Sequence, residues 1–127
     1  MSTTPNYAST PRIGSAGLTT ADANRTTPTN FGIVLAAGAS GSRIDRMSIC
    51  ATATTTAGMV RLFIHDGTTY RLIKEVQILP VTVSATQPAY AVDLTFDGGI
   101  ALPTGYSLRA STEKNEAFSV VAYGADF

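Results

Sequence analysis

The dipeptide Asp66-Gly67 constrains the fold of this chain more than any other feature. It lies within residues 59–79, between two runs rich in β-branched and aromatic residues. Aspartate followed by glycine accepts the positive φ angles of a tight turn, so the segment is predicted to be a β-hairpin. A three-residue loop, Asp66-Gly67-Thr68, would pair the strands as follows: Ile64 with Tyr70, Leu62 with Leu72, Phe63 with Arg71, and Arg61 with Ile73.

Short apolar segments recur through the rest of residues 30–127, separated by turn-forming residues. This close spacing is typical of sandwiches and barrels. Ile44 is out of phase with Met47 and Ile49, which predicts a bulge near Asp45. No long amphipathic helix is indicated. We expect an all-β fold, an antiparallel two-sheet sandwich of the jelly-roll kind with about eight strands, formed by residues 31–37, 43–54, the two hairpin strands, 90–96, 100–102, 106–111 and 117–127.

Residues 1–29 form a polar stretch in which Tyr7, Ile13 and Leu18 are the sizeable apolar side chains. Such a stretch cannot fold around a core of its own, so it is predicted to be an extended N-terminal arm. Two interpretations are open: a floppy tail, or a segment that becomes ordered on a neighbouring subunit. The spaced apolar residues favour the second.

Charge and cysteine content limit the classes of partner. Nine basic and nine acidic side chains balance, and charged residues are only 14% of the chain. No net field would therefore draw the protein to nucleic acid or to an anionic membrane. Cys50 is the single cysteine, which excludes an intramolecular disulfide and fits a reducing cytoplasm. The polar first ten residues and the short apolar runs predict neither a cleaved signal nor a membrane span.

Residues able to carry catalysis are scarce. His65 is the only histidine and is expected to be an exposed polar residue beside the hairpin turn. Cys50 is expected to pack as a small residue, and the turn aspartates Asp66, Asp93, Asp97 and Asp126 do not match a calcium loop. We predict no catalytic, cofactor-binding or metal-binding residue. An enzyme would need a site assembled between subunits around His65 or these aspartates.

Residues 61–75 and 102–113, together with the ending at 118–127, resemble small structural proteins encoded in the virion gene clusters of tailed bacteriophages and prophages. The resemblance covers about the last two thirds of the chain and involves no catalytic signature. It implies a β-sandwich that coats or decorates a particle, often as a trimer, with an arm that reaches the shell or a neighbour.

The expected function is therefore a capsid decoration, or cement, protein of the virion, made in the bacterial cytoplasm. Its expected partners are itself, as a homotrimer, and the major capsid protein or other virion proteins. The alternative is a tail-fibre or baseplate module that recognises a host surface glycan, with Tyr70 or Tyr123 available to stack on sugars. Deleting residues 1–28 is expected to abolish particle binding but leave the sandwich folded. The candidate interface residues are Tyr7, Ile13, Leu18, His65, Asp66, Val121, Tyr123 and Phe127.

Overall fold

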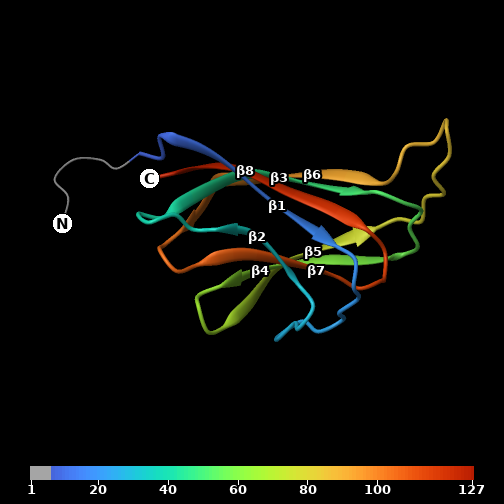
Figure 1. Ribbon diagram of the computed structural model, residues 1–127, viewed down its shortest axis with the longest axis horizontal. Helices are drawn as coiled ribbons and strands as arrows, with labels where there is room; N and C mark the ends of the chain where they lie inside the picture. The colour runs from blue at the N-terminus through green and yellow to red at the C-terminus, as the bar shows by residue number, and fades with distance from the viewer. Residues whose placement is uncertain (1–6) are drawn as a thin grey trace.

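The computed structural model describes residues 7–127, which form eight β-strands in two sheets and, within that range, no helix. The two sheets lie one above the other (Figure 1). The strands are β1 (Thr10–Leu18), β2 (Gly32–Ala36), β3 (Ser42–Ala51), β4 (Gly58–His65), β5 (Tyr70–Ile78), β6 (Ala91–Leu102), β7 (Ser107–Thr112) and β8 (Phe118–Asp126).

The strand order makes the fold a jelly roll. Sheet A has the order β1-β8-β3-β6 and sheet B the order β2-β7-β4-β5, with antiparallel neighbours throughout. Every connection crosses from one sheet to the other except the β4–β5 hairpin. This is the two-sheet arrangement that the sequence predicted.

The core lies between the sheets and is built by alternation along each strand. On β3, Met47 and Ile49 are fully buried, whereas Arg46 and Cys50 on either side of them are exposed and Ser48 between them is half-buried. A strand places successive side chains on opposite faces, so each strand contributes every second residue to the core. The bulge predicted near Asp45 is confirmed, because the register shifts between Ile44 and Arg46 against both neighbouring strands.

The hairpin forms, but the predicted register was wrong by one residue on β5. His65 pairs with Tyr70, Ile64 with Arg71 and Phe63 with Leu72, so the loop has four residues. The cause is Asp66, whose carboxylate accepts hydrogen bonds from the backbone N–H of Thr68 at 2.9 Å and of Thr69 at 2.7 Å. These hydrogen bonds give the turn four residues instead of the predicted three, and Gly67 lies within it at φ 103°.

Two further expectations need correction. Residues 10–18, expected to belong to an arm outside the sandwich, are β1, the edge strand of sheet A, and pair with β8 of the same chain. Residues 1–6 of the predicted arm lie outside the described residues. The turn expected at Asp97-Gly98-Gly99 does not end a strand: β6 continues to Leu102, and residues 96–99 bulge out of its pairing with β3. Two glycines at positive φ, Gly98 and Gly99, permit this bulge.

The β1–β2 connection (residues 19–31) folds over the outer face of sheet B, and in the view of Figure 1 it runs below that sheet. It is tied down by the backbone N–H of Asp22, which donates to the carbonyl of Thr112 at 2.8 Å, and by an ion pair between Arg25 and Glu75 at 2.9 Å. Pro28, within the connection, is itself buried. The two outer faces of the sandwich therefore differ, because one is covered by the chain itself.

Candidate functional site

Three of the predicted interface residues meet on the outer face of sheet A. Ile13 of β1 lies directly opposite Tyr123 of β8, and Val121 is two residues along the same strand, opposite Ser15. Ile13 is 67% exposed, the most exposed large apolar side chain of any strand. The antiparallel register between β1 and β8 brings these residues together, which a reading of β1 as a separate arm could not foresee.

The rest of this face is mostly small and polar, with acidic and basic side chains interspersed. A Cβ atom added at Gly17 would have no heavy atom within 4 Å, so the surface over β1 is open. The guanidinium of Arg46 lies over the ring of Tyr123, 4.3 Å from its centroid, and makes a cation–π contact with it. The other outward residues of the two central strands are the small Ser48, Cys50, Ser119 and Ala125. Beside the bulge of β3, Arg43 and Asp45 are also exposed and form an ion pair at 2.7 Å.

The other predicted interface residues lie elsewhere. Leu18 is 4% exposed and belongs to the core, and His65 is buried rather than exposed. The ring of His65 packs on Tyr70 with centroids 4.4 Å apart, and its Nδ1 accepts a hydrogen bond from the N–H of Gly67 at 3.2 Å. Asp66 is exposed at the hairpin tip, and Phe127 is half-buried beside Gly41 at the same end of the sandwich. Tyr7 precedes β1 and is 72% exposed.

The sequence did not predict the ion pairs made by a buried arginine, Arg61, under the β1–β2 connection. Arg61 points to the outer face of sheet B yet is fully buried, 3.5 Å from Glu75 and 3.5 Å from Glu113. Its Nε and Nη1 and the hydroxyl of the neighbouring Ser111 have no hydrogen-bond partner. The hydrogen bond and charge of Arg25 lower the pKa of Glu75, so this carboxylate stays ionised beside Arg61.

Nearer the hairpin, the same outer face carries a stacked cluster. Nη1 of Arg109 donates to the hydroxyl of Tyr70 at 2.7 Å, and the guanidinium lies 4.6 Å from the ring centroid of Phe31. Phe31 in turn meets Tyr70 edge-on. Tyr70 is therefore occupied by its own chain, and the cluster fixes the end of the β1–β2 connection onto sheet B.

No group of three or more metal-ligating side chains comes together within residues 7–127. One polar cluster consists of Ser42, Asp126 and Arg12. The Ser42 hydroxyl donates to Oδ1 of Asp126 at 2.5 Å, and Arg12 forms an ion pair with the same oxygen at 3.2 Å. The Ser42 hydrogen bond and Arg12 lower the pKa of Asp126. This cluster joins β1, β3 and β8 through side-chain hydrogen bonds and an ion pair.

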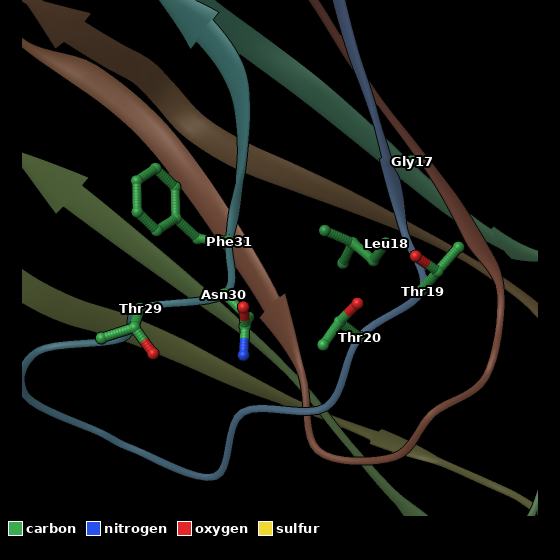
Figure 2. A pocket seen from close by; sticks show the side chains of 7 residues that line it. All are labelled: Gly17, Leu18, Thr19, Thr20, Thr29, Asn30 and Phe31. Atoms are coloured by element: carbon green, nitrogen blue, oxygen red, sulfur yellow. The ribbon is translucent and has the colours of Figure 1, made fainter.

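A hollow of about 190 Å³ lies where β1 passes into the β1–β2 connection. Figure 2 shows Leu18, Thr19 and Thr20 on one side of it and Thr29, Asn30 and Phe31 on the other. Its lining contains no charged side chain, so it offers hydrogen-bond donors and acceptors but no carboxylate, imidazole or thiol.

Comparison with known proteins found no family model and no curated protein that matches this chain. In the part of the chain that the structure describes, no helix is long and apolar enough to cross a membrane.

Proposed function

We propose that this chain is a non-enzymatic structural protein of a tailed-phage virion, a capsid decoration protein that binds across capsomers and stabilises the head. In this proposal it is made in the bacterial cytoplasm, acts as a homotrimer and contacts the major capsid protein or other virion proteins. The observation that carries the proposal is that the chain covers one outer face of the sandwich and not the other. Within residues 7–127, the chain covers sheet B with its own β1–β2 connection and leaves uncovered the outer face of sheet A, with its apolar group at Ile13, Val121 and Tyr123.

A face of this kind suits a flat protein partner. Isolated exposed apolar residues are ordinary, but Ile13, Val121 and Tyr123 form a contiguous group on one sheet, and such groups mark interaction sites. The low charge means that binding would depend on shape and buried apolar area, as in permanent assemblies. A sandwich laid over a boundary between capsomers adds buried area that must be lost before the shell can open.

The experiment is co-sedimentation of the purified chain with phage heads assembled without it. We expect saturable binding by the wild type and loss of binding by Ile13→Asp. Ile33→Asp is the matched control, because Ile33 is 47% exposed on the edge strand of the other sheet. Full binding by Ile13→Asp, or absence of the chain from purified virions, would contradict the proposal. Deleting residues 1–28 is no longer a clean test, because it removes β1 and the cover of sheet B.

The alternative, a tail-fibre or baseplate module that binds a host glycan, has less support. Stacking on sugars needs a free aromatic face, and an arginine already lies over both tyrosines proposed for it, Arg109 over Tyr70 and Arg46 over Tyr123. A glycan array separates the two functions. Saturable glycan binding by the isolated chain would favour the alternative.

A further inference from the structure

The two open sides of the sandwich, where the edge strands of sheets A and B meet, are built differently. On the β1–β2 side the strands touch: a Cβ atom added at Gly14 would lie 2.1 Å from the carbonyl oxygen of Val34. On the β5–β6 side a hollow of about 390 Å³ separates the sheets. We call this hollow the seam. Its apolar lining consists of Ile64, Ile73, Leu94, Phe96 and Ile100.

Bulges on both edge strands expose apolar side chains along the seam. Leu62 and Phe63 of β4 pair with Lys74 and Leu72 of β5, which leaves Ile73 as the extra residue, 41% exposed. On β6, the bulge at residues 96–99 carries Phe96. Bulges re-aim side chains and interrupt the pairing of an edge strand, so this side is suited to side-chain packing rather than to indefinite strand addition.

The charges beside the seam are unpartnered and of opposite sign on its two edges. Within residues 7–127, Asp93 and Asp97 are the carboxylates that make neither a side-chain hydrogen bond nor an ion pair, and both are on β6. Arg71 and Lys74 on β5 have no such partner either. Each molecule thus has one basic and one acidic edge around an apolar hollow.

We propose that the seam is occupied by a second copy of this chain, with the β5 edge of one subunit packed against the β6 edge of the next. Each molecule then places Arg71 and Lys74 beside the neighbour's acidic edge, and Ile73 and Phe96 are withdrawn from water. Because the contact joins two different surfaces, its repetition gives a ring where the rotation between neighbours closes and an open filament where it does not. The inference rests on the self-association part of the proposed function, which gives the ring three subunits.

Charge reversal followed by restoration tests the contact in the isolated protein. The mass measured by sedimentation is expected to be that of three chains for the wild type. Arg71→Glu/Lys74→Glu and Asp93→Lys/Asp97→Lys should each weaken assembly by roughly tenfold or more, because like charges then face one another. When the two reversed proteins are mixed, opposite charges meet only where unlike chains are neighbours, and a ring of three must contain at least one contact between like chains. The fourfold variant carries all the changes, so opposite charges meet at every contact and it should assemble again. Assembly that is insensitive to both reversals would overturn the β5–β6 contact.

An apolar pair of variants tests the hollow itself. Ile73→Asp should yield single chains, whereas Val83→Asp, at a residue 38% exposed in the β5–β6 connection, should remain assembled. Circular dichroism on each variant separates loss of assembly from loss of fold. A wild type that sediments as a single chain would overturn the inference. If the wild type assembles and the variants respond as expected but heads are not bound, the inference stands and the decoration function fails.

Discussion

Ile13 and Tyr123 face each other across the β1–β8 pair on the outer face of sheet A, where Ile13 is open to solvent and Tyr123 carries the guanidinium of Arg46 over its ring. Ile13 is 67% exposed, whereas Leu18, five residues along the same strand, is 4% exposed and lies in the core. One strand thus carries a surface residue and a core residue of similar size. This contrast separates contact residues from residues that hold the fold.

We predict that Ile13→Asp changes the free energy of unfolding of the isolated chain by no more than about 0.5 kcal/mol, because the side chain is already in water. Leu18→Asp places a charge in the core and should cost about 4 kcal/mol or more. Urea unfolding of both variants measures the difference. Equal costs would mean that Ile13 is needed for the fold and is not a free contact residue.

Alternation of apolar residues was enough to predict the sandwich, because a half-buried strand repeats every two residues. The pattern predicted β3 and its bulge from Ile44, Met47 and Ile49 alone. It failed for β1, where Gly14, Ala16 and Gly17 carry too little apolar surface to mark a strand. That strand is stabilised by its nine residue pairs with β8, a long-range interaction that no local pattern contains.

The site was predictable only in part for a related reason. Val121 and Tyr123 could be placed on one face of the last strand from their spacing, but their contact with Ile13 depends on sheet order. Arg61 shows the opposite failure. Arg61 alternates with the core residue Leu62 and so points away from the core, yet it is buried, because the β1–β2 connection folds over that side.

Because β1 and β2 lie in close contact at Gly14, we predict that adding a single methyl group there lowers the stability of the fold. A Cβ at Gly14 would lie 2.1 Å from the Val34 carbonyl oxygen, a backbone atom that can move only if the two strands separate. Gly14→Ala should therefore destabilise the chain by about 1–3 kcal/mol. Gly17→Ala on the same strand is the control and should be within about 0.5 kcal/mol of the wild type, since nothing lies near it. Thermal unfolding of both variants would show equal midpoints if the close approach were unimportant.

The guanidinium of Arg61 is buried, so we predict that removing the arginine and removing its carboxylate partners have different effects on the stability of the fold. Arg61→Met keeps the volume and removes a buried charge with two unpartnered nitrogens, so it should be at least as stable as the wild type. Glu75→Gln/Glu113→Gln leaves the charge in place without compensation and should be clearly destabilised.

Arg61→Ala supplies the volume control for this pair. It opens a cavity and should be about 2–5 kcal/mol less stable than Arg61→Met. Unfolding in urea would order the variants, and an Arg61→Met protein clearly less stable than the wild type would show that the ion pairs themselves hold the β1–β2 connection.

We predict that acid loosens the β1–β2 connection before the sandwich unfolds, because protonation of the Asp22 carboxylate weakens the hydrogen bonds that it accepts. It accepts hydrogen bonds from the backbone N–H groups of Asn30 at 2.9 Å, Asn24 at 2.9 Å and Thr29 at 2.6 Å. These bonds, that from Asn30 foremost, lower its pKa below the ordinary aspartate value. A lowered pKa in the folded state stabilises the fold above the unfolded pKa, about 3.9, and this contribution is lost as the pH falls through the folded pKa.

Amide hydrogen exchange, corrected for its intrinsic pH dependence, measures the effect. Below about pH 4, protection of the Thr29 and Asn30 amides should fall while that of the core strand β3 persists. Asp22→Asn keeps one acceptor oxygen but has no carboxylate to protonate, so its protection at these amides should be weaker at neutral pH and should not change further in acid. A wild-type connection that stays protected until β3 exchanges would show that the cover of sheet B is held by Phe31, Pro28 and Arg25 rather than by the Asp22 carboxylate.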